Sequence, residues 1–313
     1  MRIYRDLNKI EEEECVATIG IFDGVHNGHK HLFSELKQKA KELNKETAVI
    51  TFWPHPKIVL QKDNSTEIRF LTTIEEKIDL IDNFGIDNLY IIPFTQDFAK
   101  ISAFDFMYQY LFQKMHISHL IIGHNQTIGN ERERNLDNIK EYSIKCNFSV
   151  STIDSKLLND KKISSSKIRE YISNGEIELA NEFLGYNFFI NGTVVHGDQI
   201  GRKIDFPTAN VRVNHPYKLI PQQGVYAVLV KINGIAHKGM MNVGTRPTVT
   251  KSTEVVLEVN LFDFNEEIYR DNISIELIKQ IRTEKHFNSI QELKDQLIND
   301  KIIITEILNN YNL

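Results

Sequence analysis

Residues 16–29 read VATIGIFDGVHNGH, in which an apolar run leads through a short turn into a helical pattern. The apolar run over residues 16–22 predicts a buried strand. Between residues 28 and 43, leucine and alanine side chains recur at spacings of three and four, which predicts a helix with one buried face. A strand followed directly by a helix is the first half of a βαβ unit, so this stretch indicates an α/β domain.

The same alternation continues along the chain as far as residue 153. Residues 46–53, 88–94 and 118–123 have the composition of apolar strands, whereas residues 74–84 and 103–115 carry helical patterns. Such alternation predicts a parallel sheet with right-handed crossovers. Ligands of such sheets bind beyond the carboxyl ends of the strands.

A different pattern begins near residue 185. Two short helices are predicted at 164–173 and 176–184, and a last helix at 290–309. The apolar strands between them are separated by turn-rich segments and lie at residues 188–197, 224–232, 236–244, 254–262 and 273–281. This pattern is typical of an antiparallel sheet or a small barrel. We therefore predict two domains, residues 1–182 and 183–313.

Composition narrows the class of protein. The chain has 313 residues, of which 41% are hydrophobic and 25% charged, and its net charge is -5. This balance argues against nucleic-acid binding, which normally needs a basic surface. Cys15 and Cys146 are too few for a disulfide framework. Because the sequence shows neither a signal-peptide pattern nor a run of about 20 apolar residues, we expect a cytoplasmic protein without a membrane partner.

Two histidines mark the first candidate site, in the turn after the first strand. Gly28 lies between His26 and His29, so a phosphate could approach the backbone there. The start of a helix adds N–H donors and a positive dipole end, and both histidines could offer N–H donors or charge to one phosphate. Two alternatives stay open: surface histidines at a helix start, or a zinc site, for which no third ligand with suitable spacing is evident.

These residues resemble the HxGH signature of the nucleotidyltransferase superfamily, whose members transfer a nucleotide monophosphate and release pyrophosphate. The signature alone also fits pantetheine-phosphate, nicotinamide-mononucleotide and glycerol-phosphate enzymes. Residues 163–169, ISSSKIR, resemble the ISSTxIR element that binds nucleotide phosphates; the alternative is a serine N-cap with a solvated arginine. Residues 52–56, FWPHP, resemble the FxPHP loop of the flavin branch, and the alternative there is a rigid proline turn.

The C-terminal half carries a second signature. Residues 192–210, GTVVHGDQIGRKIDFPTAN, resemble the riboflavin kinase signature GxVxxGxxxGRxxGFPTAN. Residues 224–227, 242–248, 257–264 and 282–287 continue the resemblance in the same order. Over nearly its whole length, the chain therefore resembles the prokaryotic bifunctional riboflavin kinase/FAD synthetase family.

This resemblance implies an α/β fold with two parts. An N-terminal Rossmann-like nucleotidyltransferase domain with a parallel sheet would precede a C-terminal antiparallel β-barrel riboflavin kinase domain with a closing helix. Two ATP-dependent activities are implied: riboflavin kinase, which forms FMN and ADP, and FMN adenylyltransferase, which forms FAD and diphosphate. The expected partners are ATP, riboflavin and FMN, and the expected metal is Mg2+. The sequence does not define an oligomeric state.

The resemblance also assigns site residues by position. In the adenylyltransferase, the expected catalytic residues are His26 and His29, the expected ATP contacts are Phe22, Gly24, Gly28, Ser164, Ser165 and Arg169, and the expected FMN contacts are Pro54, His55, Pro56 and Asn125. In the kinase, the expected ATP contacts are Gly197, Gly201, Arg202, Thr208 and Asn210, of which Thr208 and Asn210 also hold Mg2+, and Arg282 contacts the flavin.

Glu258 is the expected base of the kinase. It lies in the apolar strand VVLEVNLF and shares a face with Val256 and Asn260, where a carboxylate is either solvated or used in chemistry. The resemblance implies that it takes the proton of the ribityl 5'-hydroxyl group of riboflavin, a contribution typically worth about 10²–10⁴-fold in rate.

One loop departs from the family pattern. Ile128 stands where an aromatic residue is usual, and Arg134 stands where a glycine is usual. These departures favour, as the alternative function, a riboflavin kinase whose adenylyltransferase domain is weakened or inactive. A flavin- or nucleotide-binding regulator without turnover is a further alternative, against which Glu258 and the PTAN segment argue.

Overall fold

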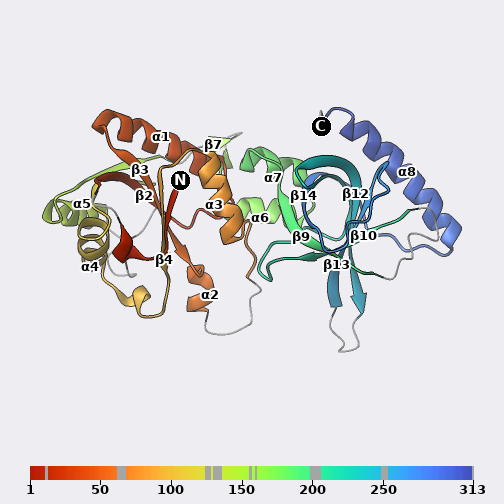
Figure 1. Cartoon of the computed structure of the whole chain (residues 1–313), viewed down its shortest axis with the longest axis horizontal. Coiled ribbons are helices and arrows are strands. Elements are labelled where there is room, and N and C mark those ends of the chain that lie inside the picture. The colour runs from red at the N-terminus through yellow and green to blue at the C-terminus, as the bar shows by residue number, and fades with distance from the viewer. Residues whose placement is uncertain are drawn as a thin grey trace. The chain divides into compact units, whose positions relative to one another are not determined.

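The computed structural model describes residues 1–10, 13–61, 68–123, 128–129, 136–154, 157–158, 161–197, 206–247 and 253–311. The chain divides into two compact units, Met1–Ser165 and Ser166–Leu313. Figure 1 shows a sheet with helices in the first unit and a barrel in the second. The two units are described separately.

The first unit is built on a six-stranded sheet in which every neighbouring pair is parallel. Its strands are β1 (Arg2–Tyr4), β2 (Cys15–Ile19), β3 (Glu46–Trp53), β4 (Asn88–Pro93), β5 (Ile117–Gly123) and β6 (Ser149–Ile153). Their order is β1-β4-β3-β2-β5-β6. The chain thus builds the sheet to one side of β2 and then to the other, so the carboxyl end of β2 is a topological switch point.

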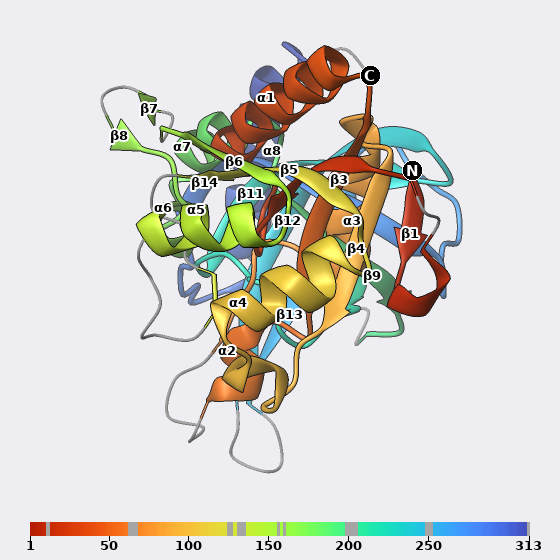
Figure 2. The same ribbon diagram turned by 90° about the vertical axis from the view of Figure 1, so that its left-hand side faces the viewer.

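Helices cover both faces of this sheet, as predicted from the alternation of strand and helix. Helices α1 (Asn27–Leu43) and α3 (Ile74–Asn83) pack on one face. On the other face lie α4 (Ala103–Asp105), the π-helix η3 (Phe106–Phe112) and α5 (Leu136–Lys145). In Figure 2, α1 lies across the sheet from α4 and α5. Alternate residues of each strand therefore enter different cores.

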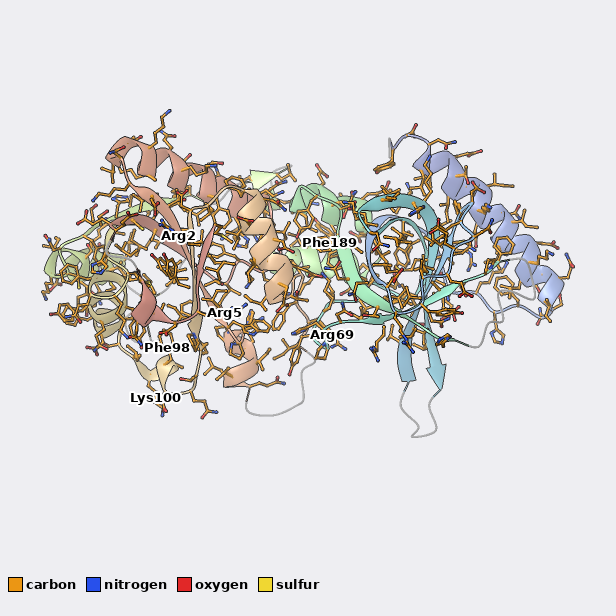
Figure 3. The ribbon with its side chains drawn as sticks, in the orientation of Figure 1. Arg2, Arg5, Arg69, Phe98, Lys100 and Phe189 are labelled. Atoms are coloured by element: carbon orange, nitrogen blue, oxygen red, sulfur yellow. The ribbon has the colours of Figure 1, made fainter. Side chains whose placement is uncertain are left out.

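The predicted helix at 103–115 differs from a regular α-helix. After α4, the N–H groups of Gln113 and Met115 donate to the carbonyls of Tyr108 and Tyr110, five residues earlier. An aromatic cluster lies at this wider turn. In it, Phe98 (Figure 3) packs edge-on against Phe106 and Tyr110. The predicted strand 16–22 is also shorter than expected and ends at Ile19, since the backbone turns into a loop before residue 22.

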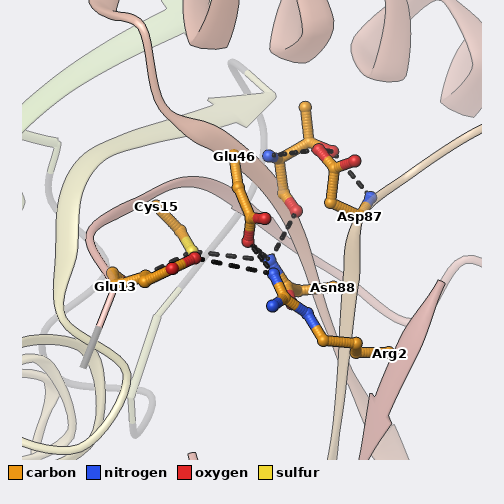
Figure 4. Close-up of polar contacts among 7 residues, drawn as sticks. Arg2, Glu13, Cys15, Glu46, Asp87 and Asn88 are labelled. Atoms are coloured by element: carbon orange, nitrogen blue, oxygen red, sulfur yellow. Dashed lines mark hydrogen bonds and ion pairs between the residues drawn. The ribbon is translucent and has the colours of Figure 1, made fainter. Parts of the chain in front are cut away.

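A polar network joins the amino ends of the strands, at the opposite edge of the sheet from the β2–α1 loop (Figure 4). The guanidinium of Arg2 donates to Asn88 Oδ1 at 3.0 Å and pairs with Glu46. Asn88 Nδ2 donates to Glu46 Oε2 at 2.8 Å and to Cys15 Sγ at 3.6 Å. Burial raises the pKa of the Cys15 thiol to about 11, so the thiol stays protonated and unreactive. The network attaches β1 to the sheet.

The second unit begins with α6 (Ser165–Ser173) and α7 (Ile177–Leu184), which lead into a closed six-stranded barrel. Its strands are β9 (Phe189–Val195), β10 (Ala209–Val213), β11 (Gly224–Ile232), β12 (Ile235–Pro247), β13 (Thr253–Leu261) and β14 (Asn272–Thr283). The order around the barrel is β10-β13-β12-β11-β14-β9, every pair is antiparallel, and β9 pairs with β10 to close it. The predicted antiparallel barrel is confirmed.

Helix α8 (Ile290–Leu308) covers one side of the barrel. Its Ile304 and Leu308 pack against Val225, Ala227 and Met240, which therefore point outward from β11 and β12. The residues that alternate with them, Tyr226, Val228, Met241 and Val243, are fully buried and point into the barrel. The remaining short elements are η1 (Leu7–Lys9), α2 (Pro56–Leu60), η2 (Phe98–Lys100), β7 (Leu157–Leu158) and β8 (Lys161–Lys162). Within the described ranges, no helix has the length and apolar character needed to cross a membrane.

Candidate active sites

The loop between β2 and α1 has an unusual backbone. Phe22 and Val25 have positive φ angles of 51° and 36°, and Gly24 has a φ of 82°. Residues other than glycine rarely adopt this region, and a β-branched residue such as valine does so with most difficulty. Phe22 and Val25 are buried in the helix-covered core. The surrounding structure therefore holds the loop in a strained conformation, as is common at functional sites.

Asp23 forms several of the hydrogen bonds that keep the loop in this conformation. Its buried Oδ1 accepts hydrogen bonds from the backbone N–H groups of Leu71 (2.9 Å) and Thr72 (3.1 Å). The Gly24 N–H donates to the Thr72 hydroxyl at 3.0 Å, and the Ser165 hydroxyl donates to the Asp23 carbonyl at 2.8 Å. The loop is thus fixed to two distant segments of the chain. Sequence alone gave no reason to single out Asp23, because an aspartate beside a glycine is ordinarily explained by the turn itself.

His26 and His29 lie together at the start of α1. Their rings are stacked, with centroids 3.6 Å apart and planes 14° from parallel. His26 is the N-cap of the helix, and its Nδ1 accepts the backbone N–H of His29 at 3.3 Å. Its proton must therefore sit on Nε2, which makes that nitrogen a hydrogen-bond donor. The structure therefore places both histidines on the first turn of α1, as their spacing of three residues predicts.

His29 is electrically neutral at physiological pH. Burial holds its pKa well below the usual value, and the neighbouring His26 and Lys77 lower the pKa further. The ring can therefore donate one hydrogen bond to a phosphate but supplies no charge of its own in this state. Packing also favours glycine at position 28, because a Cβ there would lie 3.2 Å from atoms of the His26 ring.

The expected flavin loop follows β3. His55 caps α2 by accepting the Lys57 N–H on Nδ1 at 3.0 Å, and its ring stacks on Phe70 with centroids 4.3 Å apart. Phe70 is buried and immediately precedes Leu71, one of the residues that hold Asp23. The loop is therefore coupled by direct contact to the segment that positions the histidine loop.

Of three residues singled out in the segment that follows β5, only Ile128 is described. Asn125 and Arg134 lie outside the described residues. Ile128 is buried in the core beside α4 and η3, where its aliphatic side chain fills space among apolar groups. In the second unit, Arg169 of α6 donates to the Ser166 hydroxyl at 3.2 Å.

The second candidate site is a row of side chains across the barrel. Glu258 on β13 is paired in register with Asn210 on β10 and with Asn242 on β12. Asn242 is in turn opposite Val225, which is opposite Arg282 on β14. Residues opposite one another in neighbouring strands point to the same face. Val225 points outward, so the whole row lies on the outer surface of the barrel.

Asn210 is buried within this row, 8% exposed. A Cβ on Gly197 would lie 2.1 Å from Asn210 Nδ2, so only glycine lets the chain approach this amide. The Asn260 side chain, also on β13, donates to the Pro207 carbonyl at 2.7 Å and holds the segment that contains Thr208. Glu258 itself is half-buried beside these amides. Asn242 had no role assigned from sequence, because its proximity to Glu258 depends on strand register.

Arg282 has a defined partner in the barrel unit. Its guanidinium Nε and Nη2 each lie 2.9 Å from Oδ2 of Asp300, which is on α8 and is only 1% exposed. The ring of Phe287 lies 5.7 Å from the guanidinium carbon. The arginine therefore connects the end of the row to the covering helix. Gly201 and Arg202 lie outside the described residues.

The oxygen-rich end of the row fits a hard divalent cation. No cluster of three or more His, Cys, Asp or Glu side chains suitable for a metal occurs in the parts of the chain that are described. Mg2+ does not require one, because it commonly takes one or two protein oxygens together with substrate phosphates and water. Thr208 and Asn210 are two residues apart on an extended segment, so their side chains lie on the same side of it.

Comparisons with known proteins cover both units. The FAD synthetase family model matches residues 8–167, and the riboflavin kinase family model matches residues 184–308. A protein of Bacillus subtilis, named bifunctional riboflavin kinase/FMN adenylyltransferase, is 40% identical over 94% of this chain and 93% of its own length. A protein of Escherichia coli with the same name is 33% identical over 98% and 96%.

A solved structure is similar across both units. It is described as a macrolide-efflux protein from Streptococcus pneumoniae and is 29% identical in sequence, with a TM-score of 0.89. The match covers 97% of this chain and 98% of that one. The same succession of a parallel sheet and a barrel therefore occurs in that protein.

Proposed function

Because the chain belongs to the family of bacterial bifunctional riboflavin kinase/FMN adenylyltransferases, we infer that it carries out two successive ATP-dependent reactions. Riboflavin and ATP give FMN and ADP, and FMN and a second ATP give FAD and diphosphate. The observation that carries this conclusion is that both family models match, in order, over almost the whole chain. The alternative of a kinase with an inactive first domain has no support in the histidine loop, which is fully formed.

We propose that Glu258 is the base of the kinase reaction. Its carboxylate would accept the proton of the riboflavin 5'-hydroxyl as that oxygen attacks the γ-phosphorus of ATP. The amides of Asn210 and Asn242 flank the carboxylate in the barrel row and would restrict its orientation. Gly197, with Gly201 and Arg202, would contact the phosphates, and Arg282 the flavin.

We propose Thr208 and Asn210 as the protein ligands of Mg2+. Their neutral oxygens suit a cation whose charge is balanced by ATP phosphates. Bound Mg2+ supplies charge neutralisation for the transferred phosphoryl group. Asn260 contributes indirectly, because its hydrogen bond to the Pro207 carbonyl fixes the segment on which Thr208 lies.

We propose that adenylylation takes place at the histidine loop. A phosphate oxygen of FMN would attack the α-phosphorus of ATP, and diphosphate would leave with its bonding electrons. His26 and His29 would donate N–H groups to the phosphates, together with the N-terminus of α1. Phe22, Gly24, Gly28, Ser164, Ser165 and Arg169 are the proposed ATP contacts, and Pro54, His55, Pro56 and Asn125 the proposed FMN contacts.

We propose that the boundary between the catalytic domains lies between residues 182 and 183. We also propose that the protein is located in the cytoplasm. Cys15 and Cys146 are both buried and not joined in a disulfide, which supports a reducing compartment.

Incubation with riboflavin, ATP and Mg2+, followed by chromatography of the flavins, tests the whole proposal. FMN and FAD should both appear, and FMN should be converted to FAD when it is the only flavin supplied. A parallel reaction with excess chelator should form neither product. Formation of FMN alone would support the kinase-only alternative, and formation of neither product with Mg2+ present would refute both assignments.

A further inference from the structure

Lys77 is a buried cation beside the loop that carries the histidine pair. It lies in α3, and only 3% of its surface is exposed. Its Nζ donates a 2.6 Å hydrogen bond to the carbonyl of Ile21, to which the Thr51 hydroxyl also donates at 3.3 Å. Ile21 immediately precedes Phe22, where the backbone enters its first left-handed conformation. Lys77 therefore fixes the point at which the loop leaves the sheet.

Lys77 remains charged at neutral pH despite its burial. Burial lowers its pKa to about 8, and the carboxylate of Asp23 partly offsets this effect. Asp23 is buried as well, and its own hydrogen bonds hold the loop from the other side. An opposite charge of this kind is what makes an ammonium group tolerable in a protein interior.

His29 responds to the charge on Lys77. Repulsion from Lys77 lowers the pKa of His29, after the larger effects of burial and of His26. Geometry acts in the same direction, because His29 Nδ1 is buried and has no hydrogen-bond partner within the described part of the chain. A second proton on the ring would leave an unsatisfied buried N–H group. The ionisable groups around His29 are thus His26 on its own helix and Lys77 on α3, with Asp23 facing Lys77.

We propose that Lys77 is a positioning residue for FMN adenylylation, which fixes the Ile21 carbonyl ahead of the histidine loop and holds its positive charge near the His29 ring. This inference rests on the proposed role of His29 as a phosphate donor. An uncharged ring forms no ion pair with the phosphates of bound ATP. Its hydrogen bond then strengthens mainly as charge builds up during transfer, and this difference is what accelerates a reaction.

Lys77→Met tests the role in the full-length protein, because it keeps the length of the side chain but removes the donor and the charge. The kcat for FAD formation from FMN should fall about 10- to 100-fold, as expected when a reacting group is misplaced. Riboflavin phosphorylation by the same protein should stay at the parental rate. Lys37→Met is the matched control, since Lys37 Nζ donates to the Phe84 carbonyl at 3.1 Å at the other end of α3. It should leave both rates unchanged.

Titration of the His29 ring by NMR provides a readout that does not depend on activity. The signal can be identified by its loss in His29→Gln. Its midpoint should rise in Lys77→Met and in Lys77→Gln, and should return to the parental value in Lys77→Arg, which keeps the charge. An unchanged midpoint, or an unchanged rate of FAD formation in folded Lys77→Met, would overturn the proposal.

If Lys77→Met does not fold, Lys77→Gln tests the charge alone, because its amide can still donate to the Ile21 carbonyl; an unchanged His29 midpoint in folded Lys77→Gln would overturn the proposal. A parental protein that formed no FAD would refute the proposed adenylylation but would leave the His29 titration as a test of Lys77.

Discussion

The surroundings of Glu258 are set by the pairing of its strand, β13, with β10 on one side and β12 on the other. On β13 it faces the amides of Asn210 and Asn242, two groups that come from strands on either side. Neutral amides can hold a carboxylate in place through hydrogen bonds, and a general base must be positioned within reach of the proton that it accepts.

Glu258→Gln keeps the shape of the side chain and its capacity for hydrogen bonds but removes the base. Riboflavin phosphorylation should fall about 10²–10⁴-fold, while FMN adenylylation and the thermal unfolding temperature change little. Glu266→Gln, at an exposed glutamate in the connection after β13, is the control. Kinase activity near the parental level in Glu258→Gln would show that another group accepts the proton.

Lys77 gives a pH dependence whose sign can be worked out. Its pKa is about 8 in the folded protein and ordinarily 10.5, so between these values the unfolded chain binds more protons. Folding stability attributable to Lys77 therefore rises as pH increases from 8 to 10.5, by up to about 3 kcal/mol. Denaturant unfolding of the parent and of Lys77→Met at several pH values isolates this contribution. A difference between the two proteins that does not vary with pH would contradict it.

At the scale of elements, an ion pair between Arg282 and Asp300 attaches helix α8 to the barrel row. Removing one partner of a buried pair leaves the other uncompensated, and the partial exposure of Arg282 (20%) reduces that cost. Asp300→Ala should therefore lower the free energy of unfolding by about 2–3 kcal/mol and weaken riboflavin binding. The double variant Arg282→Met/Asp300→Leu should recover the stability but not the binding. Equal losses of stability in both proteins would mean that the charge is not what matters.

The elements that sequence could predict are those whose patterns are complete within one segment. Residues 224–232 form β11 as predicted, and α1 differs from its prediction by one residue. The sequence pattern does not predict β10, because this strand is only five residues long and is defined by its pairing with β9 and β13.

The same distinction applies to the sites. The HxGH turn could be recognised from adjacent residues, whereas Lys77 looks like an ordinary solvated lysine in the pattern IEEKIDLIDN. Its burial becomes apparent only when α3 is packed against the sheet. Asp23, whose partners are 48 and 49 residues away, could not be distinguished from a turn aspartate for the same reason.

At the scale of the whole molecule, the contacts of α7 bear on whether the barrel unit can act alone. Asn181 of α7 accepts the Phe188 N–H at 2.7 Å and donates to the Leu277 carbonyl at 2.8 Å, so α7 is part of the barrel unit. Residues 183–313 and 166–313 should both phosphorylate riboflavin, but the longer fragment should unfold at a higher temperature. Calorimetry and a kinase assay on both fragments check this. A soluble, inactive longer fragment would show that the kinase site needs the first unit.

The closure of the barrel has a consequence for the protein during its synthesis. Arg282, at the end of the row, is made after Asn210, Asn242 and Glu258, and its strand β14 ends at Thr283, so the row and the closed barrel cannot exist until that strand has left the ribosome. The first unit is complete at Ser165, more than a hundred residues earlier. At about 5–20 residues per second, this interval lasts several seconds. A nascent chain can therefore fold its nucleotide-binding sheet while its kinase is still being translated.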